Sequence, residues 1–225
     1  MDAVQGNQGE YNKFFMARNI DAKCRLCRRA GEKLFLKGDR CNSPKCAIIR
    51  KSYPPGMHGK RMTRGLSEYG RQLAMKQKIK RIYGIMERQF RKHFEEIKNK
   101  PGITGDLLMN RLEMRLDNMI YRLGFASSRS FARQLVSHGM FKVNGKKVNI
   151  PSFEVKIGDA VTLPENKASN NYFKSHLQIL KNKKDFPSWI AFDFQKLEGK
   201  VIAAPARGDT GASVDPQMVV EYYSR

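Results

Sequence analysis

Residues 115–151, RLDNMIYRLGFASSRSFARQLVSHGMFKVNGKKVNIP, decide the fold class. Apolar residues at three- and four-residue spacing predict one helical stretch that ends at Gly124 and then a shorter helix that ends at Gly139. Asn144-Gly145 between apolar β-formers predicts a hairpin, because both residues accept the positive φ angles of a type I′ turn. With a further strand near 159–163, residues 107–163 predict a compact α/β unit of helix, helix, hairpin and strand.

The segment before this unit is helical and basic. From Ser67 to Ile97 apolar residues recur mostly at three- and four-residue steps, and lysines and arginines lie between them. Gly84 interrupts the pattern, so a break or a kink is expected there. The segment predicts one long or two consecutive amphipathic helices with a basic outer side, ended by Pro101-Gly102.

The segment after the unit carries weaker signals. A helix is expected near 171–180, followed by a half-buried strand at 189–194 in which Trp189 belongs to the core. Two more strands are expected at 201–203 and 218–223. The chain as a whole therefore predicts a mixed α and β protein whose helices dominate the first half.

The charge balance points to a polyanionic partner. The 225 residues hold 43 Lys and Arg against 21 Asp and Glu, a net charge of +22 and a pI near 10.1. Such an excess is typical of proteins that bind nucleic acid, and an anionic membrane surface is the competing partner. The excess is concentrated early, since residues 18–64 carry 14 basic and three acidic residues. No apolar run is long enough to span a bilayer, and no secretory signal precedes the basic region, so a reducing cytoplasm is expected.

The four cysteines form a separate signal. Cys24, Cys27, Cys41 and Cys46 have the spacing C-x2-C-x13-C-x4-C, which can place four thiolates around one zinc ion. Four sulfur ligands leave no open coordination position, so the site would be structural rather than catalytic. Free structural cysteines, two disulfides and an iron–sulfur cluster are the alternatives. The lysines and arginines between the cysteines exceed what a metal site needs, and they favour a phosphate-binding surface over a merely solvated face.

Catalytic motifs are missing from the sequence. It contains no GxGxxG, no P-loop and no nucleophile–His–acid arrangement, and its four histidines have no metal-ligand spacing. No enzymatic activity is therefore expected.

Three segments together carry a family resemblance. They are CRLCRRAGEKLFLKGDRCNSPKCAIIRKSYPPGMHG from Cys24, LSEYGRQLAMKQKIKRIYGIMERQFRKHF from Leu66, and the stretch quoted first; the ending VVEYYSR fits as well. In this order they resemble the bacterial small-subunit ribosomal protein S-four family, in its zinc-bearing form with four cysteines. The resemblance covers residues 18–225.

The resemblance implies an α+β fold of two parts. A mainly helical first domain with an N-terminal zinc knob of four cysteines would comprise residues 18–106 and 188–225. The helix-helix-hairpin S-four RNA-binding module, residues 107–187, would be inserted into it. Residues 1–17 would be a variable extension.

The resemblance also implies a function. Members of the family are structural constituents of the small ribosomal subunit in the cytoplasm, present as monomers within the ribosome. They bind the five-way junction in the 5′ domain of the ribosomal RNA early in assembly. They lie beside ribosomal protein S-five near the messenger RNA entry site, affect translational accuracy, and in some bacteria repress their own operon. An RNA-modifying enzyme that carries an S-four module and a zinc-ribbon transcription factor are the two alternatives to this interpretation.

Candidate RNA-contacting residues are the basic side chains of these segments, with polar or aromatic residues beside them. They are Arg25, Arg28, Arg29, Lys37, Arg40, Lys45, Arg50, Lys51, Tyr53, His58, Arg61, Arg64, Lys76, Lys78, Arg81, Arg111, Arg115, Asn118, Arg122, Arg129, Arg133, His138, Asn144 and Lys146. Steps of three and four residues would align four of them along one helix edge, namely Arg111, Arg115, Asn118 and Arg122.

Overall fold

The structure is a computed structural model that describes residues 19, 21–61, 65–181, 183, 185–206, 208 and 214–225. Its helices are α1 (Lys23–Ala30), α2 (Asp39–Asn42), α3 (Ala47–Arg50), α4 (Glu68–Tyr83), α5 (Glu87–Lys98), α6 (Thr104–Glu113), α7 (Leu116–Leu123), α8 (Arg129–Ser137), α9 (Glu165–Ala168), α10 (Asn171–Lys181) and α11 (Gln217–Ser224). Its strands are β1 (Lys142–Val143), β2 (Lys146–Lys147), β3 (Ala160–Thr162), β4 (Ile190–Asp193) and β5 (Glu198–Val201).

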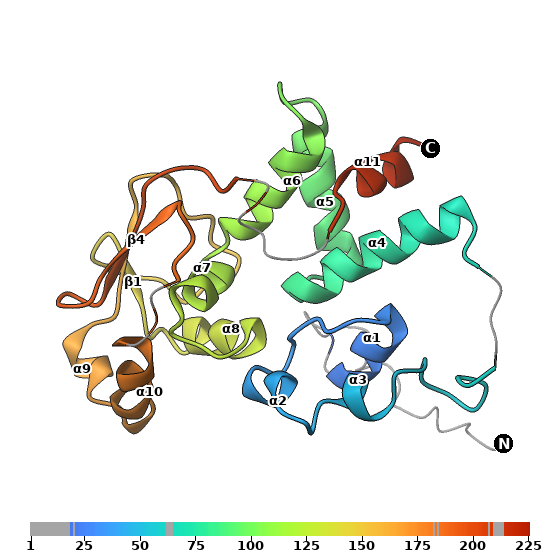
Figure 1. Cartoon of the computed structure of the whole chain (residues 1–225). Helices are drawn as coiled ribbons and strands as arrows, with labels where there is room; N and C mark the ends of the chain where they lie inside the picture. Colours follow the sequence, from blue (N-terminus) through green and yellow to red (C-terminus); the bar gives the residue numbers. More distant parts are fainter. Residues whose placement is uncertain are drawn as a thin grey trace, which may run out of the picture.

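Two hydrophobic cores divide the molecule. One core lies among α4, α5 and α6, with Ile79, Phe90 and Leu108 fully buried in it. The short helices α1 to α3 lie below α4 in Figure 1, and α11 lies beside it. The other core lies between the helices α7 and α8 and the sheet, which form the opposite half of the view. The mixed helical and sheet fold predicted from the sequence is confirmed.

Local signals determine the ends of α4. The Ser67 hydroxyl accepts a hydrogen bond from the Gly70 backbone N–H at 3.2 Å and caps the start of the helix. The helix ends at Tyr83, because Gly84 takes a left-handed conformation with φ of 65°. The predicted break at Gly84 is confirmed, and two helices follow one another as expected.

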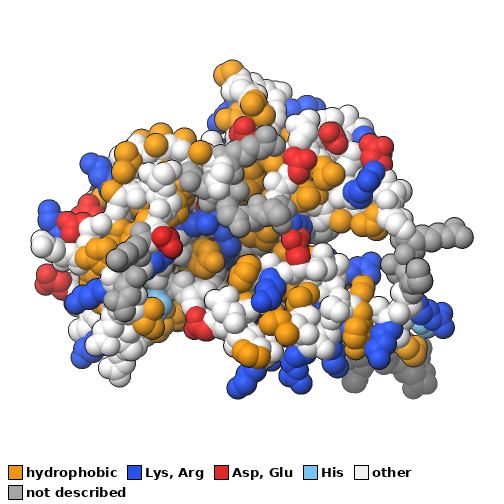
Figure 2. Space-filling model, in the orientation of Figure 1, with side chains coloured by type: hydrophobic (Ala, Val, Ile, Leu, Met, Phe, Trp, Pro, Cys, Tyr) orange, Lys and Arg blue, Asp and Glu red, His pale blue; other side chains and the backbone are white. Residues whose placement is uncertain are grey.

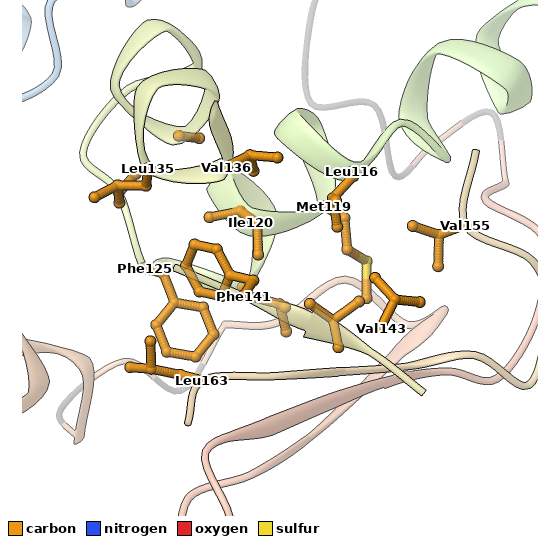
Figure 3. Close-up of a cluster of buried hydrophobic side chains, with 14 of the residues drawn as sticks. Leu116, Met119, Ile120, Phe125, Leu135, Val136, Phe141, Val143, Val155 and Leu163 are labelled. Atoms are coloured by element: carbon orange, nitrogen blue, oxygen red, sulfur yellow. The ribbon is translucent and has the colours of Figure 1, made fainter. Parts of the chain in front are cut away.

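The sheet is antiparallel throughout, with the order β2-β1-β3-β5-β4. Asn144 and Gly145 have φ angles of 48° and 78°, as the predicted hairpin between β1 and β2 requires. Figure 3 shows apolar side chains of α7 and α8 above the strands, where they meet Phe141 and Val143. Trp189, just before β4, is fully buried in this core, as expected.

The predicted single helical stretch before Gly124 is broken in two. α6 ends at Glu113 and α7 begins at Leu116. Between them the backbone bonds to a distant segment: the Leu116 N–H donates to the Phe153 carbonyl at 2.8 Å, and the Val155 N–H donates to the Met114 carbonyl at 2.9 Å. The apolar spacing continues across this break, so the sequence pattern does not reveal it.

The C-terminal segment differs from the expectation in two ways. Residues 190–201 join the sheet through β3 instead of returning to the helical half. The strand expected at 218–223 is wrong, because this segment forms α11. Its Val219 is fully buried and its Tyr223 ring stacks on Phe94 with centroids 4.6 Å apart. α11, which packs on α4 and α6, and Val214 just before it do rejoin the first half of the chain.

The boundary expected near residue 107 also falls inside a helix. α6 spans it, and its Leu108 and Leu112 are fully buried in the helical core rather than in the sheet core. The change of core occurs between Leu112 and Leu116. Within the described residues, no helix is long and apolar enough to cross a membrane.

Candidate nucleic-acid interface

The four cysteines converge although they come from three short helices. Cys24 and Cys27 lie on α1, Cys41 lies on α2, and Cys46 immediately precedes α3. All four line one small cavity, and Cys27, Cys41 and Cys46 are buried. The thiols are free, so the disulfide alternative does not describe this structure.

Some features around the thiols suit a site of four sulfur ligands, and others do not. The Lys37 backbone N–H donates to Cys41 Sγ at 3.4 Å, a contact that stabilises a thiolate. Burial raises the pKa of the Cys27 thiol, a backbone hydrogen bond from Leu34 opposes that rise, and the neighbouring cysteines add to it. As they stand, however, no three His, Cys, Asp or Glu side chains of the described residues are arranged to hold a metal ion. The donor set fits zinc, while the sulfur positions do not form a closed site.

Exposed cations surround this cysteine region. Figure 2 shows Lys and Arg side chains along the lower edge of the molecule, where α2, α3 and the loop after them lie. The predicted contact residues that are exposed there are Arg25, Arg29, Lys37, Arg40, Lys45, Arg50, Lys51, His58 and Arg61. None of these side chains has an ion pair with any residue that the structure describes. Their charge is available to an external anion. Arg64, the remaining predicted contact of this region, lies outside the described residues.

Two predicted lysines of α4 are buried and paired instead. Lys76 Nζ lies 2.7 Å from Glu87 and 4.4 Å from the centre of the Tyr222 ring. Lys78 Nζ lies 2.6 Å from Glu32. Lys76 joins α4 to α5 and Lys78 joins α4 to the loop after α1, so their prediction as RNA contacts is not supported by where they lie.

Arg81, also on α4, has a different environment. It lines a cavity of about 610 Å³ between α1, the end of α4 and α8, together with Lys23, Arg129 and Arg133. Burial lowers the pKa of its guanidinium, and the positive charge of Arg29 lowers it further. Among the described residues, no hydrogen bond or ion pair reaches this guanidinium. An anion in the cavity would supply its missing partner.

Arg122 of α7 and Arg129 of α8 belong to a buried polar network. Fully buried Glu113 accepts hydrogen bonds from Tyr83 Oη at 2.5 Å, Asn118 Nδ2 at 2.6 Å, and Arg122 Nε and Nη2 at 2.9 and 2.7 Å. Burial would raise the pKa of Glu113, but the Arg122 guanidinium outweighs burial and lowers it. Arg129 completes the network by donating to Asn118 Oδ1 at 2.8 Å.

The other arginines of this region are also paired. Arg115 is only 2% exposed and donates twice to Asp117, at 3.1 and 2.8 Å. Arg133 approaches the same carboxylate at 3.5 Å. Arg111 pairs with Glu96 and donates from Nε to His93 Nδ1 at 2.9 Å. The helix edge predicted from Arg111, Arg115, Asn118 and Arg122 does not form, because the helix is interrupted between Glu113 and Leu116, and Arg115 and Asn118 are buried.

The hairpin leaves its lysines exposed. Asn144 is occupied by internal bonds, since its Nδ2 donates to Asp159 at 2.8 Å and its Oδ1 accepts from the Ala160 N–H at 2.9 Å. Lys146 and His138 are exposed, as an RNA contact requires. Sequence reasoning missed Lys142 and Lys147, which lie directly opposite each other on β1 and β2 and are both exposed. Like charges at opposed positions destabilise a sheet, and this signal marks a face that suits an anion.

Comparison with known proteins agrees with this arrangement. Residues 18–113 match the family described as "Ribosomal protein S4/S9 N-terminal domain", and residues 114–161 match the family described as "S4 domain". The chain is 52% identical over 210 residues to "Small ribosomal subunit protein uS4A" of Clostridium novyi. The aligned residues make up 93% of this chain and 100% of the relative. It is 52% identical to "Small ribosomal subunit protein uS4" of Caldicellulosiruptor bescii, with the same coverage. These relatives are structural proteins rather than enzymes.

The join between the two matched regions, residues 113 and 114, coincides with the change from one hydrophobic core to the other. A match of this identity over nearly the whole chain settles its family. The chain belongs to the S4 family of small ribosomal subunit proteins.

Proposed function

We propose that this protein is a structural constituent of the small ribosomal subunit in the cytoplasm, where it binds the subunit's ribosomal RNA. The observation that carries the proposal is the division between two sets of cations. The predicted contact residues that are exposed around the cysteine region and on the hairpin have no ion pair among the described residues, whereas Arg115 and Arg122 are paired internally. The exposed set is the part that an RNA backbone would neutralise.

The proposed binding mode is electrostatic and depends on shape. Lysine and arginine side chains on a rigid surface contact phosphates, release counterions and position the protein without reading base edges. The short helices α1 to α3 and the hairpin would form two such contact areas, one on each half of the molecule. Binding through both areas fits a folded RNA better than a straight duplex.

We also propose that one zinc ion stabilises the first contact area. Cys24, Cys27, Cys41 and Cys46 would hold it, with small shifts of the sulfurs toward tetrahedral positions. When bound, zinc would tie α1, α2 and the start of α3 together and thereby fix the cations that these helices carry. Elemental analysis of protein purified without chelator should give one zinc per chain, and a metal content near zero would refute this proposal.

The finer role rests on family membership. We propose that the protein binds the five-way junction in the 5′ domain of the ribosomal RNA early in assembly. There it would lie beside ribosomal protein S-five near the messenger RNA entry site and influence translational accuracy, as a monomer within the subunit. Repression of its own operon belongs to the same set of proposals. Exposed basic surfaces on two sides of one chain suit a protein that joins several RNA helices.

Binding to a transcript of the small-subunit 5′ domain tests the proposal. The logarithm of the affinity should fall steeply with the logarithm of the salt concentration, by about 0.7–0.9 per phosphate neutralised. A DNA duplex of equal length serves as the control, and a zinc-ribbon transcription factor would prefer it. Equal affinity for both, or an affinity that salt does not change, would refute the proposed function. Co-sedimentation with small subunits is the second readout.

A further inference from the structure

The loop of residues 53–61, called loop 53–61 below, has a defined fold although it contains no helix or strand. Gly56 has a φ of +109°, and its carbonyl accepts a hydrogen bond from the Gly59 N–H at 3.3 Å. A Cβ placed on Gly59 would lie 2.0 Å from the Pro54 carbonyl oxygen. Only glycine permits this approach, so the loop is closed tightly on itself.

One side chain ties the loop to the cysteine region. Arg28 donates from Nε to the Tyr53 carbonyl at 2.9 Å and from Nη2 to the Pro54 carbonyl at 3.1 Å. Its guanidinium carbon also lies 4.8 Å from the centre of the Tyr53 ring. Arg28 follows Cys27 on α1, so the helix that carries two cysteines also holds the start of the loop. A planar guanidinium can make both bonds at once, which an ammonium group cannot do.

The surface of the loop carries positive charge and no acidic side chain. Residues 40–67 contain no Asp or Glu at all. Lys51, His58, Lys60 and Arg61 are exposed in or beside the loop, and Met57 is 92% exposed at its tip. A basic loop that is held in one shape loses little conformational freedom when it meets phosphates.

We propose that Arg28 is a positioning residue that holds loop 53–61 as a preformed contact for the RNA backbone and does not itself bind RNA. Its guanidinium is half-buried, and Nε and Nη2 donate to two carbonyl oxygens of the loop. This inference rests on the proposed function and changes the role that the sequence suggested for Arg28. It makes the exposed lysine and arginine of the loop the RNA contacts, and α1 the support that orders them.

The first test needs no RNA. Trypsin needs an extended chain around the bond that it cuts, so cleavage after Lys60 is expected to depend on opening of the loop, and Arg28→Gln should raise the cleavage rate there about tenfold. The matched control is Arg29→Gln, which removes the same charge from the next, exposed position and should leave the rate within about twofold. Equal cleavage rates for the two variants would overturn the positioning role, whether or not the protein binds RNA.

The second test separates positioning from direct contact. In binding to the 5′-domain transcript, Arg28→Gln should lower affinity about tenfold and Arg29→Gln about threefold. Lys60→Gln should lower the RNA affinity of the wild-type protein. It should lower the affinity of the Arg28→Gln variant little further, because the loop is already displaced there. Additive effects of Arg28→Gln and Lys60→Gln would overturn the proposal. So would full affinity of Arg28→Lys, since charge alone would then suffice.

A third variant guards against a folding defect in α1. Gly59→Ala leaves Arg28 and the cysteines unchanged but places a methyl group against the Pro54 carbonyl, so it should lower RNA affinity as Arg28→Gln does. Unchanged affinity of Gly59→Ala would count against a preformed loop. If the wild type fails to bind the transcript while the cleavage pattern is as expected, the proposed function fails and Arg28 remains only a structural support.

Discussion

Replacing Glu113 with Gln tests whether the arginines of α7 and α8 serve the fold. Glu113 is fully buried and accepts hydrogen bonds from Tyr83, from Asn118, and from Nε and Nη2 of Arg122. Glutamine keeps the size of the side chain and one oxygen acceptor. It removes the negative charge that faces Arg122 and turns an amide NH2 group toward at least one donor.

The magnitude follows from the burial of this pair. The Arg122 side chain is 15% exposed and that of Glu113 is 0% exposed, so solvent cannot replace the lost charge. Breaking a buried ion pair from one side costs about 3–5 kcal/mol. The lower end, about 3 kcal/mol, is expected here because glutamine keeps one acceptor. For a chain of this length that loss lowers the melting temperature by roughly 6–12 °C.

Thermal and urea unfolding at pH 7 measure this loss. The control is Glu95→Gln, which removes an exposed partner of Arg91 at 2.9 Å and should cost no more than about 0.5 kcal/mol. A Glu113→Gln protein within about 1 kcal/mol of the wild type would refute the reasoning. It would mean that Arg122 is not bound to the fold and remains available to RNA.

Four further outcomes follow from the same geometry. Burial would raise the pKa of Glu87, but Lys76 and Lys80 outweigh burial and lower it from 4.5 to about 2. The ionised carboxylate therefore contributes its full stability above pH 4.5, and this contribution is lost as the pH falls toward 2. The Glu87→Gln variant should lose less unfolding free energy than the wild type between pH 4.5 and pH 2. Arg81→Gln should lower RNA affinity several-fold and leave the urea midpoint unchanged, because no described residue pairs with its guanidinium. Lys142→Gln should raise thermal stability slightly while reducing the salt dependence of RNA binding by about one phosphate contact. Cys24→Ser with Cys27→Ser should expose residues 21–50 to proteases while the sheet keeps its protection, and loss of protection in both regions would contradict two separate cores.

Sequence reasoning succeeded where the structure is decided locally. Gly84 ends α4 and Asn144-Gly145 turns the hairpin, because these features depend on neighbours in the chain. It failed at α11, where Val219, Val220 and the tyrosines resemble a strand. Contact with α4 and α6 overrides that propensity, and no local pattern carries the information.

The same difference explains the site. Exposure of the cations from Arg40 to Arg61 was predictable because residues 40–67 contain no acid that could neutralise them. The roles of Lys76 and Arg122 were not predictable, since their partners Glu87 and Glu113 lie 11 and nine residues away and meet them only after the helices pack. Basic residues alone therefore do not identify RNA contacts.

The distribution of acidic residues explains how this chain can carry so many arginines without charge repulsion unfolding it. Where helices of the two cores meet, buried cations have a carboxylate within hydrogen-bond distance, as Arg115 has in Asp117 and Arg122 in Glu113. Beyond that junction, over residues 40–67, acids are absent and the cations lie on short helices and a tight loop. Unbalanced positive charge is thus concentrated in this part of the molecule, and the opposed Lys142 and Lys147 of the hairpin are a second, smaller site of it. That part should gain the most stability from RNA, since binding would replace its missing counter-charges.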